Sequence, residues 1–257
     1  MLWRNEGRRA RIRRMETRKA ERRYDSKYIV HDGHNFVYFV IQKVACTSIK
    51  TALLPLFDLD VDRFEATRMD GTQVVLVHKL FDKSNCQVDK DALLRRLDRR
   101  YRKYFKFTFV RNPWDRLVSC YFQKIVTVPK LPGFKRADLN PPGEKVRFYP
   151  GMPFAEFVEA VHATPDEEAN PHFRSQHLTV CDPQGQVMAD FVGRFENLRE
   201  DFATVSRRIG TPELELPHRL KSKSRESRPY TDFYDGQLRD LVHDRYREDI
   251  EIFRFSY

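Results

Sequence analysis

The stretch NFVYFVIQKVACTS, residues 35–48, decides the fold of this chain. Its first half, NFVYFVI at 35–41, is a nearly continuous run of β-branched and aromatic residues, which predicts a buried strand of a parallel sheet. Its second half leads into residues 48–57, where apolar residues stand at helical spacing: Ile49, Ala52, Leu53, Leu56 and Phe57. A strand, a short loop and a helix in this order form the repeating unit of α/β domains.

A second unit of the same kind lies further along the chain. FKFTFV at 105–110 predicts another buried strand, and Pro113–Ile125 is the clearest helix in the sequence. Asn112 can cap that helix, and Pro113 stands at its first position. Further elements are expected as strands at 74–77 and 190–195 and as helices at 90–104, 154–162, 198–209 and 233–253. This alternation predicts an α/β fold with a central, mostly parallel sheet flanked by helices.

Length and charge divide the chain into an arm and a domain. The 257 residues suit one large domain. Residues 1–23 carry ten Lys or Arg against three Glu, so 10 − 3 = +7 of the net charge of +10 lies there. We expect a basic N-terminal arm at 1–25 and a single domain at 26–257. The arm either contacts an acidic partner, such as a nucleic acid, a membrane surface or a polyanionic glycan, or is a solvated extension.

The sequence also argues against several classes of protein. The four cysteines form no CxxC pair, which argues against a zinc or redox motif. No His, Asp or Glu cluster has the spacing of metal ligands, so no metal is expected. No apolar run is long enough to span a bilayer, and no signal-peptide pattern opens the sequence. We therefore expect a cytoplasmic protein without a membrane span.

The loop QKVACTS at 42–48 has the residue types of an anion-binding site. The start of a helix offers unpaired N–H groups and the positive end of the helix dipole. Lys43 adds a full charge, and the hydroxyls of Thr47 and Ser48 add donors. Ala45 and Cys46 are small enough for a ligand to approach the backbone. The loop lacks the GxxxxGK[ST] pattern of a Walker A loop, and on its own it is equally consistent with an ordinary turn that exposes a lysine.

The second unit carries a matching pair of side chains. Arg111 stands where a strand ends, which is the usual place for ligands in α/β sheets, and Ser119 lies on the helix that follows. Together they can hold a second phosphate. The alternative is an arginine that caps the sheet and a serine chosen for packing. Two such units in one chain predict a ligand with two separated anionic groups.

The motifs KVACTS at 43–48 and FTFVRNPWDRLVSCYFQK at 107–124 resemble the two phosphosulfate-binding motifs of carbohydrate sulfotransferases. The resemblance is to the group of chondroitin, dermatan and HNK-1 enzymes and their bacterial relatives. It continues in NPHFRSQ at 170–176, CDP at 181–183, DFVGRFENLREDF at 190–202 and YREDIEIF at 246–253, and so covers residues 28–257. It implies a P-loop-like three-layer sandwich. It also implies transfer of a sulfuryl group from 3′-phosphoadenosine-5′-phosphosulfate (PAPS) to a hydroxyl of a carbohydrate, which can be anionic.

The resemblance assigns roles by position. It places the 5′-phosphosulfate on Lys43, Ala45, Cys46, Thr47 and Ser48, and the 3′-phosphate on Arg111 and Ser119. Arg225 and Arg228, in a basic loop at 217–231, are secondary phosphate candidates. The sequence departs from the family at Gln42, where proline is usual, and at Ile49, where relatives often carry tryptophan.

His78 is the predicted catalytic base, because related enzymes have a proposed histidine base in the corresponding region. An unperturbed histidine titrates near neutrality, at about pH 6.5. Lys43 is expected to follow the bridging oxygen and stabilise the leaving phosphate. His172 is the rival base, or it shapes the acceptor cleft with Arg174. The basic loop at 126–153 either closes over an anionic acceptor, such as a uronic-acid glycan, or is an insertion without a role.

Two other functions fit parts of the sequence. A nucleic-acid- or polyanion-binding protein would act through the arginine-rich arm, but no recognisable reading module accompanies the arm, so nucleic acid is not the expected partner. A P-loop-like nucleotide kinase is disfavoured by the missing Walker A glycines and by the absence of a magnesium-site pattern.

Overall fold

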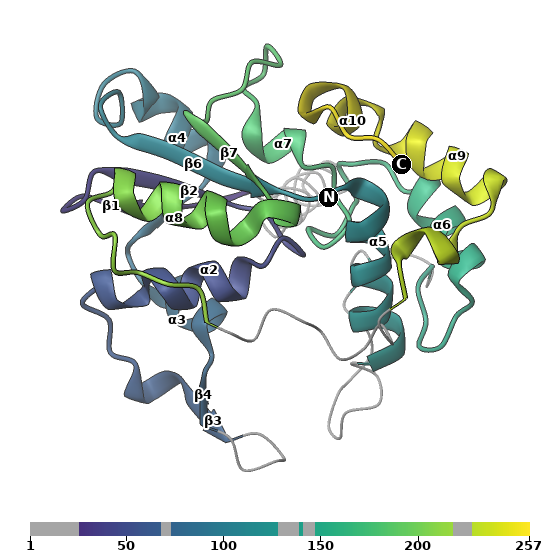
Figure 1. The fold of residues 1–257 in the computed structure, drawn as a ribbon, viewed down its shortest axis with the longest axis horizontal. Helices are drawn as coiled ribbons and strands as arrows, with labels where there is room; N and C mark the ends of the chain where they lie inside the picture. The colour runs from purple at the N-terminus through teal and green to yellow at the C-terminus, as the bar shows by residue number, and fades with distance from the viewer. Residues whose placement is uncertain (1–25, 68–72, 128–138, 141–146, 218–227) are drawn as a thin grey trace, which may run out of the picture.

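A mixed five-stranded sheet forms the centre of the domain (Figure 1). The structure, a computed structural model, describes residues 26–67, 73–127, 139–140, 147–217 and 228–257. The strand order across the sheet is β5 (Gln87–Val88), β1 (Lys27–His31), β2 (Phe36–Val40), β6 (Phe105–Val110) and β7 (Phe191–Arg194). The predicted basic arm and most of the two predicted basic loops lie outside the described residues.

The strand directions confirm the α/β class, but the sheet is mixed and not mostly parallel as predicted. β2 pairs in parallel with β6, and β6 pairs in parallel with β7. β1 is antiparallel to both of its neighbours, β2 and β5. Only residues 32–35 separate β1 from β2, and so short a connection can join only antiparallel strands. The sheet is therefore mixed, with β1 alone running against the other strands.

Both faces of the sheet are buried, as the continuous apolar run in β2 predicts. Every residue of β2 is buried. Phe36, Tyr38 and Val40 pack with α2 (Cys46–Leu53), α3 (Val77–Lys83) and α8 (Leu198–Arg208) on one face. Val37 and Phe39 pack against α4 (Lys90–Leu97) on the other face. A third apolar cluster joins α5 (Pro113–Tyr121), α6 (Phe154–His162) and α9 (Gly236–Arg245) beside the sheet (Figure 1).

The strand predicted at 74–77 differs from the observed elements. The predicted strand at 74–77 is instead β4 (Gln73–Val75), which pairs with β3 (Glu65–Thr67) outside the main sheet. α3 begins at Val77, and its buried residues Val77, Leu80 and Phe81 stand at helical spacing. His78 therefore lies in a helix rather than at a strand end.

Two predicted helices are shorter than expected. The helix predicted at 90–104 ends at Leu97. The helix predicted at 233–253 is divided into α9 and α10 (Arg247–Phe253). The break falls at Tyr246, whose backbone leaves the helical conformation and whose side chain is buried, with its hydroxyl donating to the carbonyl of Phe173. The burial and hydrogen bond of this side chain stabilise the fold more than one further helical residue would.

The helix after β6 begins as predicted and ends differently. The Asn112 side chain accepts a hydrogen bond from the backbone N–H of Trp114, which caps α5 at its first turn. After Tyr121 the helix widens into a π-helical segment, Phe122–Thr127. Such segments are rare and often mark functional sites. No helix among the described residues is long and apolar enough to cross a membrane.

Candidate functional site

The loop at 42–48 has an unusual backbone. Lys43 has a φ of 67° and Ala45 a φ of 52°, so two residues that are not glycine adopt the left-handed conformation within three positions. Each such residue costs about 1–3 kcal/mol, and this strain concentrates at functional sites. Backbone turns that include left-handed residues direct successive N–H groups to one side and create anion-binding concavities. α2 starts immediately afterwards, at Cys46.

Arg111 joins the two predicted anion-binding units. Its Nη1 donates to the carbonyl of Lys43 at 3.1 Å, and its Nε donates to Asp115 Oδ2 at 2.8 Å. The guanidinium lies over the ring of Phe195, with 3.9 Å between its central carbon and the ring centroid. The structure therefore brings Arg111 and the 42–48 loop together, as predicted. Asp115, which orients the arginine, was not predicted.

The side chain of Lys43 reaches across to α5. Its ammonium donates to Gln123 Oε1 at 2.7 Å. The pKa of Lys43 is lowered to about 8, mainly by burial. The positive charges of Arg111 and Lys124 contribute to this lowering, and two nearby cysteines, Cys120 and Cys46, oppose it. At neutral pH the lysine is therefore still charged, in surroundings that favour an additional anionic partner.

Gln42 has a local role that a proline could not fill. Its side-chain oxygen accepts a hydrogen bond from the Cys46 thiol at 3.2 Å. This contact connects the start of the loop to the first residue of α2. A side-chain hydrogen bond therefore stabilises the loop at the position where the family usually has proline.

His78 reaches the loop from α3. Its Nε2 lies 2.8 Å from Thr47 Oγ1, and its Nδ1 lies 3.4 Å from Lys50 Nζ. Burial, and then the charge of Lys50, lower the pKa of His78 to about 4. His78 therefore does not titrate near neutrality, because the buried position and the charges of Lys50, Lys27 and Lys124 all oppose its protonation.

His172 belongs to the same electrostatic neighbourhood. Its Nδ1 lies 2.6 Å from Asn170 Oδ1. Burial and the positive charges of Lys124, Lys43 and Arg116 lower its pKa well below the usual value. Both candidate bases are therefore neutral imidazoles at physiological pH. His172 is affected by the charge of Lys43 in the 42–48 loop, and His78 contacts Thr47 of the same loop directly.

Arg116 is a site residue that the sequence analysis missed. Its guanidinium donates to the carbonyls of Gln42 at 3.0 Å, Arg174 at 2.8 Å and Pro171 at 3.1 Å. It thus ties the 42–48 loop to the segment that carries His172. The one signal in the sequence was its position on α5, one turn after Asn112. Its partners are backbone carbonyls, which every residue carries, so the sequence could not show which residues it contacts.

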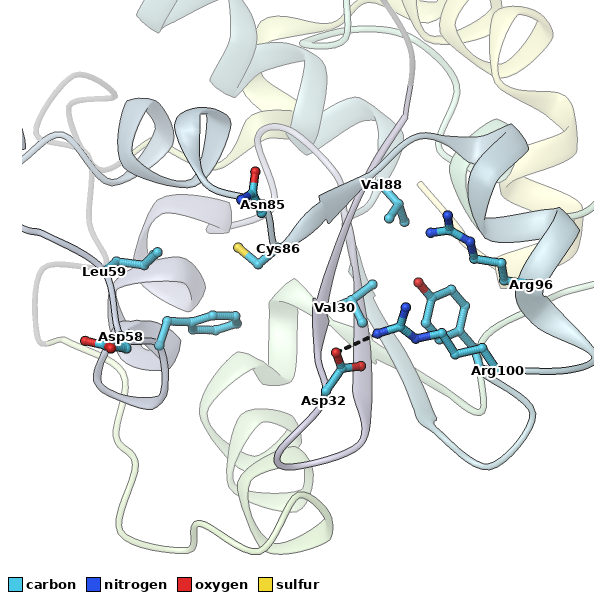
Figure 2. Close-up of a pocket in the computed structure, with 11 residues that line it drawn as sticks. Val30, Asp32, Asp58, Leu59, Asn85, Cys86, Val88, Arg96 and Arg100 are labelled. Atoms are coloured by element: carbon cyan, nitrogen blue, oxygen red, sulfur yellow. Dashed lines mark hydrogen bonds and ion pairs between the residues drawn. The ribbon is translucent and has the colours of Figure 1, made fainter.

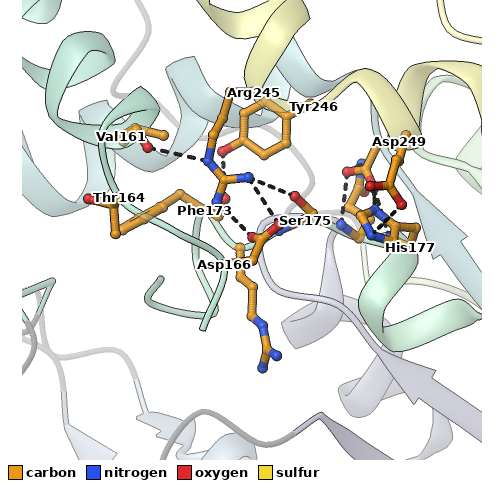
Figure 3. Close-up of polar contacts among 12 residues, drawn as sticks. Val161, Thr164, Asp166, Phe173, Ser175, His177, Arg245, Tyr246 and Asp249 are labelled. Carbon is orange, nitrogen blue, oxygen red and sulfur yellow. Dashed lines mark hydrogen bonds and ion pairs between the residues drawn. The ribbon is translucent and has the colours of Figure 1, made fainter. Parts of the chain in front are cut away.

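A buried polar network supports the 170–177 segment from the C-terminal helices (Figure 3). The Asp249 carboxylate, which has no exposed surface, accepts from the backbone N–H groups of Gln176 and His177 and from His177 Nδ1. The hydrogen bond and charge of Asp249 outweigh burial and raise the pKa of His177. The Gln176 amide in turn pairs with both the N–H and the carbonyl of Arg111. Asp249 therefore fixes this segment to the end of β6.

The remaining predicted residues are only partly brought to this site. Ser119 is half-buried on α5, one turn beyond Asp115. The Arg228 guanidinium lies over the ring of Phe233, with 4.8 Å from its central carbon to the ring centroid. Arg174 meets Arg116 through its backbone carbonyl. Arg225 lies outside the described residues. The phosphate contacts of Ser119, Arg225 and Arg228 stay predictions.

Two further features bear on the choice of site. A cavity of about 440 Å³ lies at the β5–β1 edge of the sheet, bordered by the Arg100–Asp32 ion pair, and contains no predicted site residue (Figure 2). Within the described part of the chain, no group of three or more His, Cys, Asp or Glu side chains could hold a metal ion.

Comparison with known proteins places the chain in a family. The profile described as "Sulfotransferase family" matches residues 26–256. Carbohydrate sulfotransferase 11 of Rattus norvegicus is 26% identical over 90% of this chain and 68% of its own length. Carbohydrate sulfotransferase 12 of Xenopus laevis is 27% identical over 77% of this chain and 52% of its own length. Carbohydrate sulfotransferase 8 of Mus musculus is 28% identical, over 91% and 57%.

The search of solved structures gave no significant match. The resemblance to carbohydrate sulfotransferases that the motifs predict is confirmed by the relatives. Because the family profile covers nearly the whole of the described domain, the chain belongs to the sulfotransferase family.

Proposed function

We propose that this protein transfers a sulfuryl group from PAPS to a hydroxyl of a carbohydrate acceptor, on a P-loop-like α/β sandwich. The observation that carries the proposal is the hydrogen bond from Arg111 to the carbonyl of Lys43, which joins two anion-binding units into one site. A donor with two separated phosphate groups fits such a site. Membership of the sulfotransferase family supports the reaction class.

The donor is expected to bind across the two units. Lys43, the N–H groups of the 42–48 loop, and the hydroxyls of Thr47 and Ser48 surround the 5′-phosphosulfate. Arg111 and Ser119 hold the 3′-phosphate, with Arg228 as a secondary contact. The left-handed residues Lys43 and Ala45 shape the loop before any ligand binds, which reduces the reorganisation needed during the reaction.

In the proposed mechanism the acceptor oxygen attacks sulfur in line with the bond to the bridging phosphate oxygen. One sulfur–oxygen bond forms as the other breaks, and the acceptor proton passes to His78. Negative charge collects on the leaving phosphate, where the Lys43 ammonium stabilises it. His172 and Arg174 are proposed to shape the acceptor cleft. Arg116 and Lys124 add positive charge there, which favours an anionic acceptor.

Binding of adenosine 3′,5′-bisphosphate tests the donor site. Millimolar nucleotide is expected to raise the melting temperature by several degrees, because saturation at 100 times Kd stabilises a protein by about 2.7 kcal/mol. The double variant Lys43→Ala, Arg111→Ala should show no shift. Arg100→Ala, which removes an exposed ion pair with Asp32 at the β5–β1 edge of the sheet, should retain the shift. A wild-type protein that does not respond to the nucleotide would contradict the proposed function.

The choice of base is tested by two histidine variants. His78→Ala is expected to lower kcat by about 10²- to 10⁴-fold, the usual contribution of general base catalysis. His172→Ala should act mainly on KM for the acceptor. Because the pKa of His78 is about 4, the wild-type rate should not fall until the pH drops toward that value. Rates of PAPS turnover with a panel of neutral and uronate-containing glycans provide both measurements. A larger loss of kcat in His172→Ala would assign the base to His172.

The alternative function, polyanion binding through the basic arm, depends on residues 1–25, which lie outside the described residues. The expected cytoplasmic location stays a prediction. No contact among the described residues bears on the function of the arm or on the location of the protein.

A further inference from the structure

Gln123 occupies a position that the proposed mechanism has not used. Its side-chain oxygen accepts the 2.7 Å hydrogen bond from the Lys43 ammonium. The residue is exposed and belongs to the π-helical segment Phe122–Thr127, four positions after Ser119. It therefore stands just beyond the residues predicted to bind phosphate, and it contacts the side chain with the most direct role in the chemistry.

The local backbone explains why Gln123 can reach the loop. α5 keeps its α-helical turn through Tyr121 and widens at the next residue. A π-helical turn changes the side to which each following side chain points, and such turns are frequent at functional sites. Lys124, the next residue, is close enough to lower the pKa values of Lys43, His78 and His172. The widened turn thus delivers two side chains to the site.

Gln123 is an uncharged hydrogen-bond acceptor for Lys43 in surroundings that contain several charged groups. Arg111 at the end of β6 and Lys124 on the π-helical segment are cationic, and both oppose the ammonium. Two thiols, those of Cys46 on α2 and Cys120 on α5, act in the other direction and raise the pKa of Lys43. The charge of Lys43 in turn lowers the pKa of His172. Among these described neighbours Gln123 supplies a directional acceptor that carries no charge. It can hold the ammonium without forming an ion pair.

We propose that Gln123 is a positioning residue that holds the Lys43 ammonium at the donor site and releases it to the leaving phosphate oxygen during transfer. This inference rests on the proposed function. Hydrogen bonds to charged acceptors are roughly twice as strong as those to neutral ones. A phosphate oxygen that gains negative charge therefore displaces the amide oxygen of Gln123 from Lys43. A carboxylate at position 123 would compete with that phosphate oxygen.

Two variants change this contact in opposite directions. Gln123→Glu keeps the shape of the side chain and adds a negative charge, so it should raise the pKa of Lys43 above about 8. Gln123→Leu removes the acceptor and should lower that pKa. NMR of protein labelled with ¹³C at the lysine ε-carbon measures both, with the Lys43 signal identified by its absence in Lys43→Arg. Gln237→Glu, the same change on an exposed residue of α9, is the control and should leave the Lys43 signal unmoved.

Activity gives the second readout. The wild-type kcat/KM for PAPS should fall as the pH rises through about 8, where Lys43 loses its proton. That fall should move to higher pH in Gln123→Glu and to lower pH in Gln123→Leu. At neutral pH, Gln123→Glu should also lose about tenfold in kcat, which corresponds to one pKa unit of extra interaction. A merely structural role would not shift the two variants in opposite directions.

The two proposals fail in different ways. If adenosine 3′,5′-bisphosphate does not stabilise the wild-type protein, the proposed function is wrong. If it does stabilise the protein, yet the pKa of Lys43 is the same in Gln123→Glu, Gln123→Leu and the wild type, the positioning role of Gln123 alone is overturned.

Discussion

Replacing Lys43 by methionine is expected to lower the rate of sulfuryl transfer by about 10²- to 10³-fold, the usual loss when one preorganised electrostatic contact to a transition state is removed. Methionine keeps most of the hydrocarbon stem and removes the charge. The ammonium contacts an exposed residue, Gln123, and no buried partner depends on it in the described structure. The variant should therefore fold normally and lose activity at saturating PAPS.

The measurement is kcat under saturating donor, with circular dichroism and the melting temperature as checks on the fold. Lys103→Met, the same substitution on an exposed residue at the turn before β6, serves as the control and should keep the wild-type rate. A loss of less than threefold in Lys43→Met would show that the leaving phosphate is stabilised by other groups.

Removing the Asp249 carboxylate is expected to produce the largest loss of stability, about 3–5 kcal/mol in the free energy of unfolding. Asp249→Ala would leave the backbone N–H groups of Gln176 and His177 and the His177 imidazole without their acceptor in a fully buried place. Urea unfolding measures the effect. Asp240→Ala, which breaks an exposed ion pair with Arg239 on α9, should cost less than about 1 kcal/mol.

The loss in Asp249→Ala should depend on pH. Asp249 raises the pKa of His177 in the folded state, so the stabilisation from this pair is fully present below the unfolded pKa of about 6.5 and is lost as the pH rises through the folded pKa. The cost of Asp249→Ala should therefore be greater at pH 6 than at pH 9. Equal costs at the two values would show that the backbone N–H groups account for the whole effect.

The sequence predicted well those features that depend on local patterns. The strand at 105–110 and the helix at 154–162 are confirmed with their bounds, because the apolar pattern and the flanking residues both lie within the element. The pairing of Lys43 with Arg111 also follows from local signals, since β2 and β6 are adjacent parallel strands whose ends meet at one edge. The predicted strand at 74–77 was wrong because so short an apolar run fits either a strand or a helix.

The features that the sequence did not predict depend on contacts across the fold. Arg116 bonds to residues 55, 58 and 74 positions away, and Gln123 meets Lys43 across 80 positions. Asp249 receives its partners from 72 and 73 positions away. Such pairings are fixed by how the helices pack, and neither composition nor periodicity encodes them. Gln123 had one weak signal, since it is the penultimate residue of the second resembling motif, 107–124.

Among the residues that the structure describes, the Arg116 guanidinium donates to three main-chain carbonyls, at positions 42, 171 and 174. Every amino acid, including proline, presents a carbonyl oxygen at its own position. The side chains at these three positions can therefore be exchanged without breaking the joint between the donor loop and the His172 segment, provided that the backbone path is kept. This offers a physical account of why glutamine can stand at position 42 where relatives carry proline. Side chains at 42, 171 and 174 can therefore be varied to change the acceptor cleft while the hydrogen bonds of Arg116 stay in place.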